Sequence, residues 1–290
     1  MLYHLRLFIA ASVSMLTLNA ASQNYHLEKI WETEPVFSTP ESAVFDAERD
    51  QIYISNYNTF PRDLESADDF ISVLELDGNI LTLKWITGLK APTGITIHDD
   101  HLFVVERDGI SKFKIESGEF VKKMKIKSPG FLNDIAIDDD GVIYFTDTSP
   151  RNPEASVVCS FREGSVDTIA NDLINRSNGL LYDRRSLLVG NSGDQYLKKI
   201  DLETNEVANV AQLDTGIIDG IKLYKDDKYI VSLWEGRVYL AFPGGTVNEL
   251  LDLRNSHIKT ADIEFIPDLN LVIIPTFDHN RVIAYRIEES

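Results

Sequence analysis

The sequence predicts an all-β protein, a six-bladed β-propeller whose ring is closed by an N-terminal strand that pairs with the last blade. A short phrase that opens an alternating apolar strand recurs six times, and its copies are spaced by 52, 40, 45, 41 and 43 residues. The 3.6-residue period of amphipathic helices is missing. Strand repeats with a period in the low forties are typical of propeller blades. The copies begin at Pro40, Pro92, Leu132, Ser177, Ile218 and Ala261.

The first residues differ in character from the rest of the chain. Arg6 precedes an uncharged apolar run from Leu7 to Leu18, and small residues follow at Ala20–Ser22. This pattern is that of a secretory signal peptide. We therefore expect a signal peptide at 1–22, one propeller domain at 23–290, and a secreted or periplasmic location. A membrane anchor is the alternative, although the run is short for a span, and we expect no stable span after cleavage.

Each repeat divides into four short strands, except the last, which offers three before the chain ends. The segment Tyr25–Trp31 is a strand with no partner of its own, and adding it to the last blade would close the ring and remove two sheet edges. The first repeat is longer than the others because of a polar insertion at Asn56–Asp69. That insertion is either a lid over the central pocket or a surface loop.

Composition excludes some functions. The chain has 46 acidic and 28 basic residues, a formal net charge of −18, which repels phosphate backbones and argues against nucleic-acid binding. A single cysteine cannot form an internal disulfide. Cys159 lies in an alternating strand, where we expect a small buried apolar side chain.

The second residue of each copy defines a ring of oxygen-bearing side chains. Because the first strand of each blade runs along the propeller axis, these residues should meet there: Glu41, Thr93, Asn133, Asn178, Asp219 and Asp262. Two carboxylates and two amides, from Glu41, Asp219, Asn133 and Asn178, suit Ca²⁺, although another divalent cation is possible. Zinc would require His or Cys. The alternative is that these residues only close turns.

The same phrases resemble the gluconolactonase, senescence-marker-protein and luciferin-regenerating-enzyme family of six-bladed propellers. They are similar more distantly to diisopropylfluorophosphatase and the paraoxonases. The resemblance rests on Pro40–Asp46, Leu132–Gly141, Ser177–Leu180 and Asp219–Ile221. It implies a divalent metal, usually calcium, held by Glu41, Asn133, Asn178 and Asp219.

The resemblance also implies hydrolysis of a lactone, an ester or a phosphoester, with Asp219 as base or nucleophile. The sugar-lactonase members have an arginine where this chain has Phe131. A more apolar ester or lactone is therefore expected.

Further pocket residues are expected on the same face, at the ring and at the ends of the second strands. The set is Thr93, Asn191, Trp234, Asp262 and His279. Trp234 forms either a ligand wall or inter-blade packing, and His279 is a candidate proton carrier.

The leading hypothesis is therefore a secreted, calcium-dependent hydrolase of a small molecule. One alternative is a non-catalytic propeller with structural calcium that binds a small ligand or a protein. A scaffold without metal is a further alternative.

Overall fold

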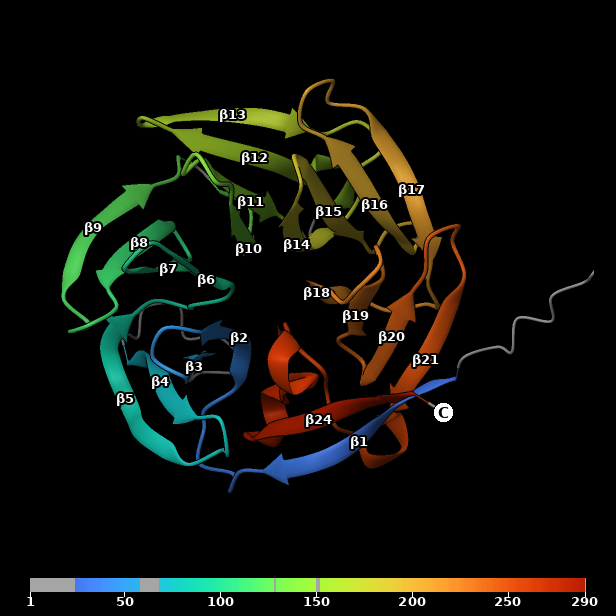
Figure 1. The fold of residues 1–290 in the computed structure, drawn as a ribbon. Coiled ribbons are helices and arrows are strands. Elements are labelled where there is room, and N and C mark those ends of the chain that lie inside the picture. The colour runs from blue at the N-terminus through green and yellow to red at the C-terminus, as the bar shows by residue number, and fades with distance from the viewer. Residues whose placement is uncertain (1–23, 58–67, 128, 150–151, 290) are drawn as a thin grey trace, which may run out of the picture.

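The computed structural model describes residues 24–57, 68–127, 129–149 and 152–289. Over these residues the chain forms six four-stranded antiparallel sheets and no α-helix. The sheets are arranged as blades around one axis, with the first strand of each blade innermost (Figure 1). The prediction of an all-β, six-bladed propeller is confirmed.

Each blade is a simple meander whose strands follow one another from the axis outward. Blade 1 contains β2 (Pro40–Asp46), β3 (Gln51–Asn56), β4 (Asp69–Glu75) and β5 (Ile80–Leu89). Blade 2 contains β6 (Ile95–His98), β7 (His101–Glu106), β8 (Gly109–Lys114) and β9 (Phe120–Lys125). Blade 3 contains β10 (Leu132–Ile137), β11 (Ile143–Asp147), β12 (Val157–Arg162) and β13 (Ser165–Ala170).

The remaining blades follow the same plan. Blade 4 contains β14 (Ser177–Asp183), β15 (Ser186–Asn191), β16 (Tyr196–Asp201) and β17 (Val207–Gln212). Blade 5 contains β18 (Ile218–Leu223), β19 (Tyr229–Leu233), β20 (Arg237–Ala241) and β21 (Val247–Asp252). Blade 6 contains β22 (Glu264–Ile266), β23 (Leu271–Pro275), β24 (Val282–Glu289) and β1 (Tyr25–Glu32). Short 3-10 helices lie at η1 (Pro153–Ala155), η2 (Arg254–Ser256), η3 (Pro267–Leu269) and η4 (Phe277–His279).

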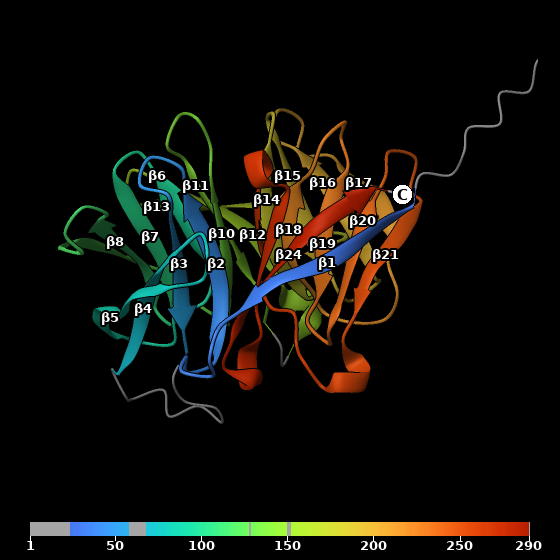
Figure 2. The same ribbon diagram turned by 60° about the horizontal axis from the view of Figure 1, so that its bottom comes forward.

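The N-terminal strand closes the ring as predicted. β1 pairs antiparallel with β24, so both ends of the described chain lie in one sheet (Figures 1 and 2). β1 also contacts both neighbouring blades: Trp31 Nε1 donates to Leu76 O of blade 1 at 2.9 Å, and Tyr25 packs edge-on against Tyr224 of blade 5. Closure by β1 therefore covers a sheet edge and ties three blades together.

The apolar core is divided into six clusters, one between each pair of adjacent blades. The division follows from the two-residue period of a strand, because successive side chains point to opposite faces. On β3, Ile52 and Ile54 pack toward blade 6, whereas Tyr53 packs toward blade 2. Cys159 is buried between blades 2 and 3, and burial raises the pKa of its thiol to about 11.

Some expectations concern residues outside the described ranges. The predicted signal peptide at 1–22 lies outside them, as does most of the insertion predicted at Asn56–Asp69. In the part of the chain that the structure describes, no helix is long and apolar enough to cross a membrane.

Candidate metal centre

A repeated irregularity shapes the inner strands. In blades 1, 3, 4 and 5 the register between the first and second strands shifts where the strand opens, so that two residues of the first strand oppose one residue of the second. Such bulges re-aim side chains next to active sites. The shifts fall at Glu41, Asn133, Asn178 and Asp219, and we call these four residues the inner ring.

Two glycines are required because the inner strands of neighbouring blades pass close to one another. A side chain at position 179 would meet the backbone oxygen of Asp219, and one at position 220 would meet the backbone nitrogen of Ile263. The pairs Asn178-Gly179 and Asp219-Gly220 therefore combine a candidate metal ligand with the glycine that lets the next blade approach.

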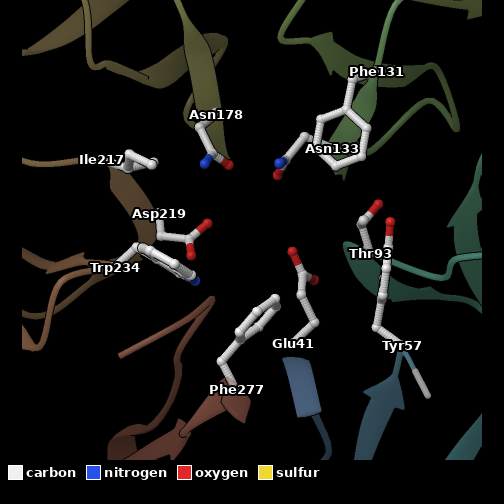
Figure 3. Close-up of a pocket in the computed structure, with 10 residues that line it drawn as sticks. All are labelled: Glu41, Tyr57, Thr93, Phe131, Asn133, Asn178, Ile217, Asp219, Trp234 and Phe277. Carbon is white, nitrogen blue, oxygen red and sulfur yellow. The ribbon is translucent and has the colours of Figure 1, made fainter. Parts of the chain in front are cut away.

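The inner ring lies at a central cavity of about 180 Å³. Figure 3 shows the oxygen-bearing side chains of Glu41, Asn133, Asn178 and Asp219 directed toward its centre, with Thr93 beside them. The remaining lining residues are mostly apolar or aromatic and surround this group: Tyr57, Phe131, Ile217, Trp234 and Phe277. Trp234 and Phe277 make an edge-to-face contact with ring centroids 5.4 Å apart.

The electrostatics of the site favour a bound cation. Asp219 is 3% exposed, and burial followed by the charges of Asp262, Asp134 and Glu235 raises its pKa well above the ordinary value. A hydrogen bond with Asn178 acts in the opposite direction. A divalent cation between Asp219 and Glu41 would compensate the two carboxylates, because buried charges require partners.

The donor atoms also fit a hard cation. Asn178 Oδ1 is buried and accepts no hydrogen bond from the described residues, whereas buried polar atoms are normally paired. Two carboxylates and two amide oxygens match calcium chemistry. Among the described residues, no three His, Cys, Asp or Glu side chains cluster as a metal site. A metal at the inner ring would need the amide oxygens as well as the two carboxylates.

Below the inner ring lies a second polar layer. The sixth copy of the repeat is shifted by one residue from its sequence alignment, because Asp262 bridges to Ser42 rather than to Glu41. Ala261 N donates to Pro275 O, and Thr93 N donates to Val105 O in the same way. Ala261 therefore occupies the position that Thr93 has beside the inner ring. Asp262 therefore lies one layer deeper than predicted, where its carboxylate accepts from Ser42 Oγ at 2.5 Å.

A lysine compensates this deeper layer. Lys222 Nζ lies 3.5 Å from Glu264 Oε2, and the charges of Glu264, Asp262 and Asp134 raise the pKa of Lys222 despite its burial. Lys222 therefore compensates the deep carboxylates. Among the described residues that line the central cavity there is no lysine, arginine or histidine.

Polar residues at the ends of the second strands hold loops in place. Their carboxylate and amide oxygens accept backbone N–H groups of the loops that lead into the inner strands. Asn191 Oδ1, for example, accepts from Asn175 N at 2.6 Å, and Glu106 Oε2 accepts from Lys90 N at 2.8 Å. We call these anchoring residues the outer ring: Asn56, Glu106, Asp147, Asn191 and Glu235.

Only some of the residues predicted for the substrate pocket line the central cavity. Thr93 and Trp234 line the cavity, whereas Asn191, Asp262 and His279 do not. Asn191 is fully buried as a loop anchor. His279 Nε2 lies 3.9 Å from Glu32 Oε1, and Phe277 of the same 3-10 helix lines the cavity instead.

Two lining residues were missed from sequence. Ile217 stands two positions before Asp219, as Phe131 stands two positions before Asn133, and both line the cavity. This repeat position was a usable signal. Tyr57 follows the outer-ring residue Asn56, and its sequence context gave no comparable signal.

Fold and site together define a propeller with a central cavity that is lined by oxygen-bearing side chains. The family model described as "SMP-30/Gluconolactonase/LRE-like region" matches residues 39–261. The chain belongs to this family. A search of the curated proteins finds no match.

Solved structures agree on the fold. A protein described as a presumptive gluconolactonase superposes with a TM-score of 0.69 at 15% identity, covering 93% of each chain. A streptogramin B lyase gives 0.66 at 13% identity over 91% of this chain and 98% of the lyase. Virginiamycin B lyase from Staphylococcus aureus, a catalytically inactive variant with quinupristin, gives 0.61 at 10% identity over 91% and 99%. At these identities the likeness concerns the fold.

Proposed function

We propose that the protein is a secreted, metal-dependent hydrolase that opens a small lactone or ester, with Ca²⁺ as the metal. The observation that carries the proposal is the convergence of Glu41, Asn133, Asn178 and Asp219 at an aromatic-walled cavity. Membership of the gluconolactonase-like family supports the reaction class.

The four inner-ring residues would hold the cation. Bound there, a divalent cation would supply Lewis-acid polarisation of a carbonyl oxygen. Asp219 would act as base or nucleophile, and Glu41 would contribute the second negative charge. The amide of Asn178 lowers the pKa of Asp219 and would help to orient that carboxylate.

The cavity wall restricts the substrate. A volume of about 180 Å³ is close to that of apolar cavities that hold one benzene ring, about 150 Å³. The aromatic faces of Trp234, Phe277 and Phe131 would hold the apolar part of such a ring. Lys259 Nζ lies 4.0 Å from the centroid of the Trp234 ring without lining the cavity.

A substrate panel tests the reaction. Lactones, aryl esters and phosphotriesters would be assayed with Ca²⁺ and with a chelator. We expect turnover of a lactone or ester that requires metal and is lost in Asp219→Asn. The control is Glu106→Gln, which alters an outer-ring residue that accepts from Lys90 N and should retain turnover. If the protein binds Ca²⁺ but turns over no substrate in the panel, the non-catalytic alternative replaces the proposal.

Secretion has its own test. The proposal requires that the mature protein lack residues 1–22 when it is expressed in its own host. N-terminal sequencing of the purified protein would give a start near Gln23. An intact Met1 in the mature protein would contradict secretion by this signal.

A further inference from the structure

A side lobe adjoins the central cavity between blades 3, 4 and 5. Its volume is about 150 Å³, and it shares four lining residues with the central cavity: Phe131, Asn133, Asn178 and Ile217. Thr148, Arg176 and Ser192 complete its wall. Because Asn133 and Asn178 border both cavities, the side lobe lies directly beside the inner ring.

Arg176 gives the side lobe a positive charge. It is the one cation among the described residues that line the central cavity and the side lobe. Arg176 is exposed and forms no ion pair with any described residue, as is also true of Arg162 and Arg286. Of these three arginines, Arg176 alone lines the side lobe beside the inner ring. In a chain of net charge −18, an arginine that lacks such a partner at a cavity wall is available to a ligand.

Ser192 adds a second hydrogen-bond donor. It is 3% exposed, and its Oγ accepts from Ile218 N at 3.0 Å. No described residue accepts from the Ser192 hydroxyl, whereas the Thr148 hydroxyl on the same wall donates to Ser177 O at 2.6 Å. A hydroxyl group can donate one hydrogen bond. Ser192 therefore retains a donor for a ligand in the side lobe.

The backbone holds these two donors together. Ser192 N donates to Arg176 O at 3.2 Å. Arg176 stands two positions before Asn178, the repeat position that Phe131 and Ile217 occupy in the adjacent blades. The repeat position that supplies apolar lining in blades 3 and 5 thus supplies a guanidinium in blade 4.

We propose that the side lobe is a carboxylate-binding subsite, and that the substrate is a single-ring lactone or ester carrying one carboxylate. The proposal rests on the proposed function and adds the substrate class. The planar guanidinium of Arg176 matches a carboxylate with two parallel hydrogen bonds, and Ser192 supplies a further donor. A phosphate dianion is disfavoured, because a single arginine would face two charges beside the carboxylates of the inner ring.

A binding experiment tests the subsite without requiring turnover. The probes are benzoate and its neutral isostere benzamide, titrated calorimetrically into the full mature protein with Ca²⁺ and again with a chelator. We expect Arg176→Gln to weaken benzoate binding roughly 10- to 100-fold, the contribution of a charge-assisted hydrogen bond, and to leave benzamide binding unchanged. Arg286→Gln, on the exposed face of β24, is the matched control.

A kinetic experiment links the subsite to the reaction. γ-Butyrolactone would be compared with the same ring bearing a carboxylate at C5. We expect the wild type to prefer the anionic lactone, and Arg176→Gln to abolish that preference mainly through KM. Ser192→Ala should reduce it by a smaller factor.

The outcomes separate the two proposals. If no lactone is hydrolysed but benzoate binding depends on Arg176, the proposed function fails and the subsite stands. If Arg176→Gln weakens benzoate and benzamide equally, or if the wild type binds neither, the subsite is overturned. Should Arg176→Gln melt below the Arg286→Gln control, Arg176→Lys and Ser192→Ala give the same comparison in folded protein.

Discussion

The inner ring and the outer ring lie on the same face of the propeller and use the same residue types for different tasks. Outer-ring oxygens accept backbone N–H groups, as Asn191 accepts from Asn175. Inner-ring oxygens face the cavity, and Asn178 Oδ1 accepts no hydrogen bond from the described residues. The difference shows that the partner of a buried polar atom, rather than its residue type, distinguishes an anchoring residue from a candidate ligand.

A matched pair of glutamates tests this comparison most strongly. Glu41 belongs to the inner ring, and Glu106 belongs to the outer ring, where it accepts from Lys90 N and Ser111 Oγ. We expect Glu41→Gln to weaken calcium binding about 100-fold or more, because it removes one of two ligand charges. Glu106→Gln should leave calcium affinity unchanged and lower the free energy of unfolding. Calorimetric titration and urea unfolding measure the two effects.

Equal loss of calcium affinity in both variants would remove the distinction between the rings. Unchanged affinity in Glu41→Gln would exclude Glu41 as a ligand.

Metal removal gives the next largest effect. A ligand that binds only the folded state stabilises it by about 2.7 kcal/mol at a concentration 100 times its Kd. We therefore expect a chelator to lower the melting temperature of the wild type and of Glu106→Gln. Asp219→Asn should show little response to the chelator. Thermal unfolding followed by circular dichroism would measure these melting temperatures. A wild-type melting temperature that is unchanged by both calcium and chelator would contradict a metal at the inner ring.

Asn178 and Asn191 give a second comparison of the two rings, with smaller expected effects. Replacing Asn191 by Leu leaves Asn175 N without its acceptor, a loss of about 1–3 kcal/mol for a buried donor. Replacing Asn178 by Leu removes an oxygen that anchors nothing in the described structure. We expect Asn178→Leu to lose calcium affinity, and Asn191→Leu to lose stability while retaining calcium affinity. If Asn191→Leu lost calcium affinity and Asn178→Leu lost only stability, the roles given to the two rings would be wrong.

The fold could be predicted from sequence because blade architecture depends on periodicity. Alternating apolar residues determine which neighbouring blade each side chain packs against, as Ile52 and Tyr53 illustrate. Ring closure could be predicted as well, because Tyr25–Trp31 had no other strand to pair with. The four inner-ring residues were grouped from their common place in the repeat, and the structure brings them together at the cavity.

The rest of the site depends on local geometry that periodicity does not encode. A one-residue shift in the sixth copy puts Asp262 below the ring level, and a strand whose side chains alternate gives no warning of such a shift. Asn191 was expected in the pocket because it ends a second strand, but its side chain turns to the incoming loop. His279 lies on a 3-10 helix that presents Phe277 to the cavity.

The smallest expected effect is a pH dependence of stability that arises from Asp262 in the deep layer. Burial raises the pKa of Asp262 to about 6, against an ordinary value of 3.8, although Lys222 and the Ser42 hydrogen bond oppose the shift. The folded protein therefore binds this proton more tightly than the unfolded chain. The resulting stabilisation is fully present below about pH 3.8 and is lost as the pH rises through about 6.

Between pH 5 and pH 7.5, metal-free wild type should lose about 1 kcal/mol more of its free energy of unfolding than Asp262→Asn. Urea unfolding in chelator at the two pH values measures this difference. Because other acidic groups titrate in both proteins, only the difference between them reports Asp262. Identical pH dependence in the two proteins would show that Asp262 keeps its ordinary pKa, and that Lys222 compensates the deep layer completely.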